Sequence, residues 1–311
     1  MTIKKMLVPV LAFVLAVGLA LTCATAQQVA DPDFKPEIRK PAYAAGRGPV
    51  VCLDEAHFNF HTASGRYAPF AELLRRDGYV VNASAAKFSA AALSSCRVLV
   101  IANALGERNQ SSWSLPIDPA YTDEEVSAVA AWVKSGGSLF LIVDHMPMPG
   151  ANRTLAAAFG VRFSNGFALI PDVNAPLVFK RADGLLADHP VTRGATKDER
   201  IDAVATFTGS AFRIDSGGEP ILVFGPQVIS LEPQVAWQFT PETPKTDVRG
   251  WLQGATLRHG KGRVAVFGEA AMFTAQLAGP NKNKVGMNSP DAPQNARLLL
   301  NVLGWLTGRL K

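Results

Sequence analysis

The chain has 311 residues, of which 48% are hydrophobic and 18% charged, and its formal net charge is +5. This length is ample for one large domain with a sizeable core. The basic residues form no run or stripe, so we expect no binding to nucleic acid.

The N-terminus has the pattern of a secretory signal peptide. Lys4 and Lys5 precede the apolar run 6–21, and Ala24-Thr25-Ala26 is a cleavage site of small residues. We therefore expect residues 1–26 to be removed and the mature protein, starting at Gln27, to be periplasmic or secreted. The apolar run of 16 residues is shorter than the roughly 17–25 residues that span a bilayer, so we expect no stable membrane span after cleavage. Lipidation at Cys23 and an uncleaved anchor are the alternatives.

Residues 27–48 are polar and contain prolines, which predicts an extended tether. The rest of the chain, 49–311, is predicted to be a single α/β domain. Its strands are short apolar runs that end in polar residues, at 50–53, 79–82, 98–102, 138–143 and 263–268. Apolar patterns at helical spacing separate or follow them, at 67–76, 87–95, 122–135, 151–159 and 295–307. This alternation predicts an open, mostly parallel sheet with helices on both faces.

Two stretches carry further local signals. Thr122, with Glu125 three residues later, predicts a capping box at the start of a helix. Residues 161–256 read as short strands broken by Gly, Pro and Asp, which predicts an antiparallel β-rich insertion in the second half of the chain.

Polar side chains follow the apolar strands directly. Asp54, Glu55 and His57 follow the first strand, Asn103 the third, Asp144 and His145 the fourth, and Glu269 the last. Because the carboxyl ends of parallel strands meet at one edge, we expect His57 and His145 to face one crevice, with Asp54 and Glu269 beside them. Such polar residues can also merely cap helices or form turns.

This group of residues supports two kinds of chemistry. The catalytic candidates, as acid–base groups, are Asp54, His57, Asp144, His145 and Glu269. The candidate ligands of a divalent metal are His57, His61, Asp144 and His145. His57 and His61 are four residues apart, but His-Phe-Asn-Phe-His is a weak zinc signal because it is not the H-E-x-x-H motif.

The mature chain has two cysteines, Cys52 and Cys96. We expect both to be free and buried; a disulfide between adjacent strands is the alternative. Cys52 lies within a predicted strand, so it is not expected to be a nucleophile. The nucleophile elbow G-x-S-x-G and the phosphate-binding glycine motifs are absent from the sequence.

Four segments carry a family resemblance, namely Thr122 to Leu139, Asp188-His189-Pro190-Val191-Thr192-Arg193-Gly194, Gly260 to Glu269, and Asn301-Val302-Leu303-Gly304-Trp305-Leu306. Taken in this order, they make the chain resemble the glutamine-amidotransferase-like, or flavodoxin-like, superfamily. Within it the chain is most similar to exported bacterial proteins of unknown function near the trehalose-utilisation-like and gliding-motility auxiliary domains. The resemblance implies the α/β fold.

The chain departs from that superfamily at the catalytic turn. The family's Gly-x-Cys-x-Gly turn is replaced by Val143-Asp144-His145-Met146-Pro147. We therefore predict no glutaminase activity. We expect the protein to bind a small polar ligand, with or without a metal ion, at the carboxyl edge of the sheet. If the protein is an enzyme, we expect it to be a hydrolase. The alternative is a non-catalytic module that binds or assembles with a protein partner of the cell envelope.

Overall fold

A computed structural model of the chain describes residues 28–311. The predicted signal peptide, its cleavage site and Cys23 lie outside these residues. Among the described residues, no helix is long and apolar enough to cross a membrane.

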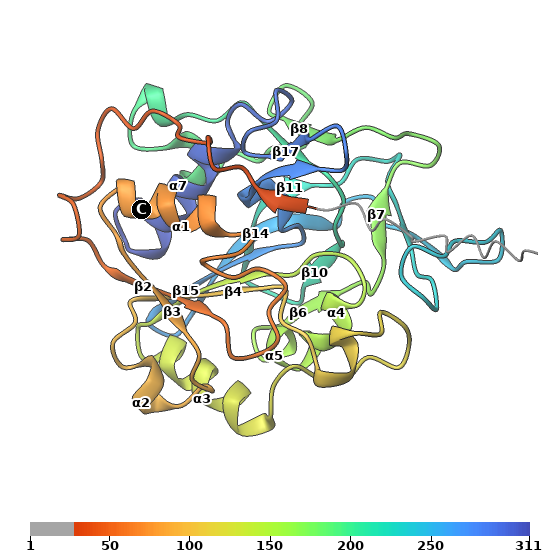
Figure 1. Cartoon of the computed structure of the whole chain (residues 1–311), viewed down its shortest axis with the longest axis horizontal. Coiled ribbons are helices and arrows are strands. Elements are labelled where there is room, and N and C mark those ends of the chain that lie inside the picture. The colour runs from red at the N-terminus through yellow and green to blue at the C-terminus, as the bar shows by residue number, and fades with distance from the viewer. Residues whose placement is uncertain (1–27) are drawn as a thin grey trace, which may run out of the picture.

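Five neighbouring parallel strands, with β3 at the edge, form one side of a nine-stranded sheet (Figure 1). Their spatial order is β3 (Val80–Ser84), β2 (Val50–Asp54), β4 (Val98–Ala102), β5 (Ser138–Ile142) and β15 (Gly262–Phe267). Along the chain this is the order second, first, third, fourth, fifth, which is the flavodoxin-like arrangement. Every residue of β4 and β5 is buried, as expected of apolar strands covered on both faces.

The sheet continues beyond β15 with antiparallel strands. These are β14 (Leu252–His259), β10 (Phe212–Ile214) and β6 (Val161–Phe163), while β11 (Gly218–Val223) also pairs with β14. The predicted α/β fold, mostly parallel with an antiparallel extension, is therefore confirmed.

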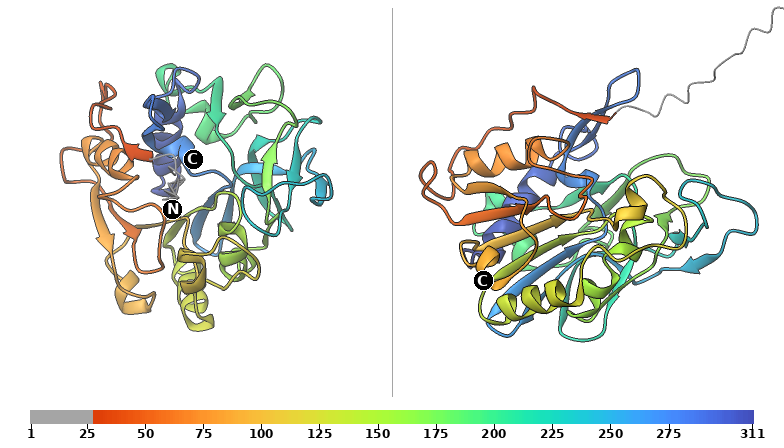
Figure 2. Two further views of the ribbon diagram at one scale, coloured as in Figure 1. Left: turned by 45° about the vertical axis from the view of Figure 1, so that its right-hand side comes forward. Right: turned by 60° about the horizontal axis from the view of Figure 1, so that its bottom comes forward.

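Helices cover both faces of the sheet (Figure 2). α1 (Ala68–Arg76) and α7 (Asn295–Leu306) pack on the face that presents Val51 and Leu53. α2 (Ala90–Leu93), α3 (Asp123–Lys134) and α5 (Arg153–Ala157) pack on the opposite face, which presents Cys52. Successive residues of β2 thus enter different cores, because side chains alternate along a strand.

The start of α3 has the predicted capping box. The Thr122 hydroxyl accepts a hydrogen bond from the Glu125 N–H (3.3 Å), and the Glu125 carboxylate accepts one from the Thr122 N–H (3.1 Å). Two otherwise unpaired N–H groups are satisfied in this way, which fixes the first residue of the helix.

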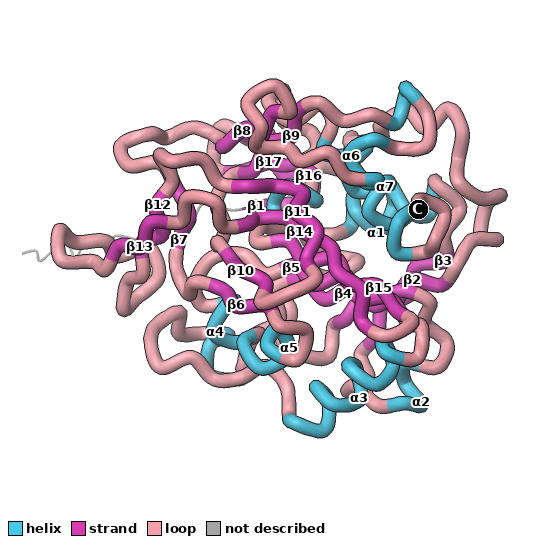
Figure 3. The backbone as a smooth tube through the Cα atoms, turned by 180° about the vertical axis from the view of Figure 1, so that it is seen from behind, coloured by secondary structure: helices cyan, strands magenta, loops and turns pink. Residues whose placement is uncertain are grey.

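Smaller elements surround the main sheet. β1 (Gln28–Ala30), within the segment expected to be a tether, pairs with β16 (Ala275–Ala278), which also pairs with β17 (Asn283–Gly286). β7 (Phe167–Leu169), β12 (Ile229–Leu231) and β13 (Lys245–Asp247) form a sheet that extends from one end of the molecule (Figure 3). The remaining elements are the pair β8 (Leu177–Lys180) and β9 (Ala203–Thr206), α4 (Met148–Ala151), α6 (Pro190–Arg193), and the short helices η1 (Glu107–Gln110), η2 (Lys197–Glu199) and η3 (Ala271–Phe273).

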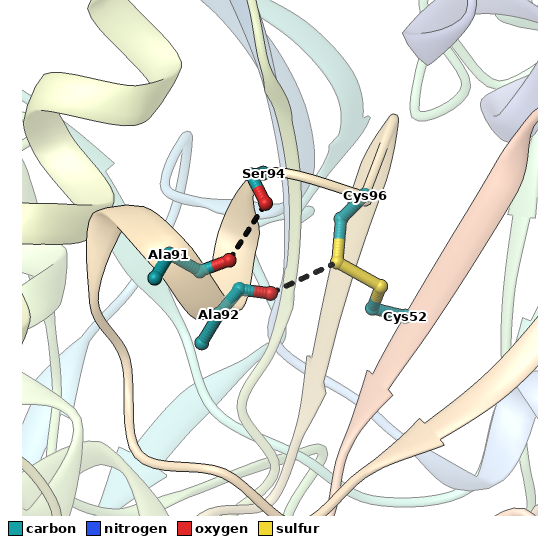
Figure 4. Close-up of a disulfide and its surroundings, with 5 residues drawn as sticks. All are labelled: Cys52, Ala91, Ala92, Ser94 and Cys96. Atoms are coloured by element: carbon teal, nitrogen blue, oxygen red, sulfur yellow. Dashed lines mark hydrogen bonds between the residues drawn. A yellow bond between two sulfur atoms is a disulfide. The ribbon is translucent and has the colours of Figure 1, made fainter.

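Cys52 and Cys96 form a disulfide (Figure 4). The expectation of two free thiols was therefore wrong. Cys52 lies in β2, and Cys96 lies two residues before its neighbour β4, which brings their Cα atoms to 5.7 Å. Strand pairing creates this proximity, across a sequence separation of 44 residues.

Candidate functional site

A cleft with a volume of about 1340 Å³ lies at the carboxyl edge of the parallel strands. The loops that follow β2 and β4 both line it, and they lead to helices on opposite faces of the sheet. The cleft therefore includes the point at which the strand order reverses, where open α/β sheets bind ligands. Residues from four strand ends or their loops meet there, namely His61, Asn103, Asp144, His145 and Glu269.

Asn103, directly after β4, connects the ends of neighbouring strands. Its Oδ1 accepts a hydrogen bond from the N–H of Asp144 (2.8 Å), and its carbonyl oxygen accepts one from the N–H of Phe60 (3.0 Å). Its φ is +53°, a left-handed conformation that Asn tolerates better than most residues. This residue thus holds the loops after β2 and β5 against the end of β4.

His145, three residues past the last residue of β5, has one ring nitrogen that is hydrogen-bonded to the backbone. Its Nδ1 lies 2.8 Å from the carbonyl oxygen of Met146. A carbonyl can only accept, so Nδ1 carries the proton, and Nε2 of the neutral ring is an acceptor. The ring stacks on Phe167 at 4.4 Å between centroids and meets the edge of Trp237 at 4.7 Å. These contacts fix the orientation of the ring.

Two acids line the same cleft as this histidine. Asp144 is 8% exposed, and its Oδ1 accepts a hydrogen bond from the N–H of His145 (2.8 Å). Glu269, two residues after β15, is fully buried, and its two oxygens accept the N–H groups of Ala271 (3.0 Å) and Met272 (2.6 Å). Burial, followed by the negative charge of Asp144, raises the pKa of Glu269 well above its usual range, although the backbone donors oppose this shift. Glu269 is therefore a carboxyl group biased towards its protonated form.

His61 and Arg66, in the loop between β2 and α1, form a further part of the cleft wall. His61 is 3% exposed and stacks on Tyr67 at 4.5 Å between ring centroids. Burial, with smaller effects from the charges of Arg66 and His145, lowers the pKa of His61 to about 3. His61 is therefore neutral at physiological pH. The Arg66 guanidinium lies 4.0 Å from the centroid of the Phe60 ring.

Asp54 and His57 lie outside the cleft, which corrects the expectation that His57 and His145 share one crevice. The His57 ring is buried between two carboxylates, with Nδ1 at 2.9 Å from Asp54 and Nε2 at 2.8 Å from Glu125 on α3. It also packs against Phe88 and Tyr121. The loop after β2 turns its first polar residues towards α3 and only its later ones, from Phe60 on, into the cleft.

The charge on His57 follows from these partners. Burial alone lowers the pKa of His57, but the hydrogen bonds and charges of Asp54 and Glu125 together outweigh it and raise the pKa. Both ring nitrogens of His57 face carboxylates, which favours the charged imidazolium and joins β2 to α3. Glu125, which was expected only to cap a helix, also stabilises this charge.

The geometry offers no ready metal centre. In the part of the chain that is described, no group of three or more His, Cys, Asp and Glu side chains is arranged to hold a metal ion. Of the four metal candidates, His61, Asp144 and His145 line the cleft and His57 does not.

Many of the residues that line the cleft were not identified from the sequence, among them Arg66, Trp113 and Trp237. Arg66 lies in the same loop as His61, so the reasoning applied to the strand ends could have found it. Trp113 and Trp237 come from long irregular segments, and Trp237 lies on the loop between β12 and β13, far along the chain from the parallel strands. No local sequence signal marks these tryptophans as parts of the site.

No protein-family model and no curated protein matches the chain. Among solved structures, it is similar to the mmIFT52 N-terminal domain, with 13% identity, a TM-score of 0.56, and coverage of 83% of this chain and 97% of that one. It is also similar to a cytoplasmic protein from Salmonella typhimurium (14% identity, TM-score 0.49, coverage 83% and 98%). A third similar structure is a ThuA-like protein from Bacteroides uniformis (12% identity, TM-score 0.47, coverage 89% and 96%). At these identities the likeness shows the α/β fold alone.

Proposed function

We propose that the cleft binds a small polar ligand and that the protein is a hydrolase acting on it. The observation that carries this proposal is the meeting of Asp144, His145 and Glu269 in one cleft, at the ends of the adjacent strands β5 and β15. Clefts that combine aromatic walls with a few converging polar groups are the usual form of small-molecule sites.

The three groups have complementary acid–base properties. Glu269, with its raised pKa, supplies a proton to a leaving group, and the nearby charge of Asp144 keeps that proton in place. Nε2 of His145 accepts a proton from an attacking water. Trp113 and Trp237 give the ligand apolar surfaces beside these groups.

We also propose that the protein works outside the cytoplasm. The N-terminal pattern at Lys4, Lys5 and Ala24-Thr25-Ala26 supports export. The Cys52–Cys96 disulfide adds independent support, because such bonds persist in oxidising compartments.

Hydrolysis of 4-nitrophenyl esters, glycosides and phosphates by the wild type and by Glu269→Gln tests the proposal. We expect the substitution to lower kcat by about 10²-fold or more, because general acid catalysis contributes roughly that factor. Glu232→Gln is the matched control: this half-buried carboxylate accepts hydrogen bonds from Ser164 and Thr246 but lies outside the cleft. Equal rates in all three proteins, with intact folding, would contradict the assignment.

One observation favours a non-catalytic binding or assembly module instead. Both oxygens of Glu269 accept backbone N–H groups, and Asp144 accepts that of His145, so these acids also organise the loops. In a module of this kind, the wild type hydrolyses none of the compounds, and Glu269→Gln changes only the stability of the protein. Ligand binding without turnover would establish this alternative.

A further inference from the structure

Arg66 is a cation for which residues 28–311 supply no anionic partner. Its side chain lines the cleft, lies over the Phe60 ring, and donates from Nη1 to the Phe60 carbonyl oxygen at 3.4 Å. Its Nε is buried and has no hydrogen-bond partner. Within residues 28–311, no Asp or Glu forms an ion pair with this guanidinium. A partly buried charge in this state is costly unless a partner arrives.

His61 adds a second unsatisfied group at the same wall. The side chain is 3% exposed, lines the cleft, and has an Nδ1 that is buried and without a hydrogen-bond partner. Both side chains come from the loop between β2 and α1 and line the cleft, and the charge of Arg66 lowers the pKa of the His61 ring. Two neighbouring groups with unused hydrogen-bonding capacity mark this wall as incomplete.

The acids of the cleft do not complete this wall. Asp144 and Glu269 accept backbone N–H groups of their own loops, and neither pairs with Arg66. No described acid therefore pairs with this guanidinium, and we take its partner to be an anionic group of the ligand. A guanidinium presents N–H donors in a planar fork that matches the two oxygens of a carboxylate or phosphate.

We propose that Arg66 and His61 form an anion subsite of the cleft, which binds a carboxylate or phosphate group of the ligand. This inference rests on the proposed function and names the chemical class of its ligand. The anionic group binds at the Arg66 wall, and the rest of the ligand extends towards Asp144, His145 and Glu269.

Titration of the full mature chain with acetate and with inorganic phosphate, at constant ionic strength, tests this subsite. The readout is the NMR signal of the His61 ring together with calorimetric affinity. We expect one of the two anions to shift the His61 signal and to raise the His61 pKa, because the bound negative charge offsets that of Arg66. The better-bound anion distinguishes a carboxylate ligand from a phosphate ligand.

Variants separate this subsite from general attraction of anions. Arg66→Gln should weaken binding roughly tenfold or more, and Arg66→Lys, which keeps the charge but loses the fork, should weaken it less. Arg213→Gln is the matched control, because that guanidinium also lies over an aromatic ring, 4.2 Å from the centroid of Trp251, but outside the cleft. Equal losses in Arg66→Gln and Arg213→Gln would overturn the proposal.

A neutral compound separates this inference from the proposed function. If glycerol changes the fluorescence of the cleft tryptophans in a saturable manner that His145→Ala removes, while neither anion binds, the anion subsite is wrong and the cleft is still a ligand site. If neither anion nor glycerol binds, both proposals are wrong. If an anion binds with the expected dependence on Arg66 but no compound is hydrolysed, the subsite stands and only the hydrolase assignment fails.

Discussion

Removing the titratable group of His61 should change how stability depends on pH. His61 has a pKa of about 3 in the folded chain against 6.5 for an unperturbed histidine. Between pH 6.5 and about 3, the His61 ring is therefore protonated in the unfolded state but not in the folded state. Stability is unaffected by His61 at higher pH and is lost as pH falls from 6.5 towards 3.

The size of this loss follows from proton linkage. Between about pH 7 and about pH 5, a group with these two pKa values costs the folded state about 2 kcal/mol, and the full loss at lower pH approaches about 5 kcal/mol. The variant His61→Gln cannot titrate at this position. The wild type should therefore lose about 2 kcal/mol more than His61→Gln over this interval.

Urea unfolding followed by circular dichroism, at the two pH values, measures this difference. Other titrating groups contribute to both proteins and cancel in the comparison. Equal pH dependence of the wild type and His61→Gln would refute the reasoning, because it would mean that the folded chain allows His61 to be protonated.

Five further expectations follow from the structure and the sequence. Asp54→Asn should destabilise the chain by about 3–5 kcal/mol, measured by urea unfolding, because it breaks a buried ion pair. The raised pKa of His57 means that its stabilising contribution is complete below pH 6.5 and declines as pH rises through the higher folded pKa, a decline that His57→Gln should lack. Cys96→Ser should cost about 4 kcal/mol, because the disulfide closes a long loop; no change in urea midpoint would contradict this. Material from the cell envelope should begin at Gln27 on N-terminal sequencing, and the purified protein should release no ammonia from glutamine.

The fold class could be read from the sequence because its signals are local. The apolar runs at 98–102 and 138–143 are long enough to mark buried strands, and the helical patterns between them imply parallel connections. The capping box of Thr122 and Glu125 is equally local, since both partners lie within one turn. The right-handed connections of parallel strands then bring Asn103, Asp144 and Glu269 to one edge.

Tertiary packing decided which side chains enter the cleft. Asp54 and His57 follow a predicted strand, as Asp144 does. His57, however, forms a hydrogen bond with Glu125 on α3 and does not line the cleft. The sequence separation of that pair is 68 residues, so no local pattern encodes it. The Cys52–Cys96 disulfide likewise depends on the pairing of two strands.

The walls of the cleft also combine features that local sequence signals encode with features that tertiary packing decides. The sequence places polar residues at the strand ends, where hydrophobic periodicity stops. The positions of Trp237 and Arg66 depend on how long loops fold over that edge, and loop conformation is set by many weak contacts distributed over the molecule. The sequence by itself therefore determined the sheet and its carboxyl edge, and only the tertiary structure decided which charges and aromatic rings line the cleft, because those contacts join residues that are far apart in the chain.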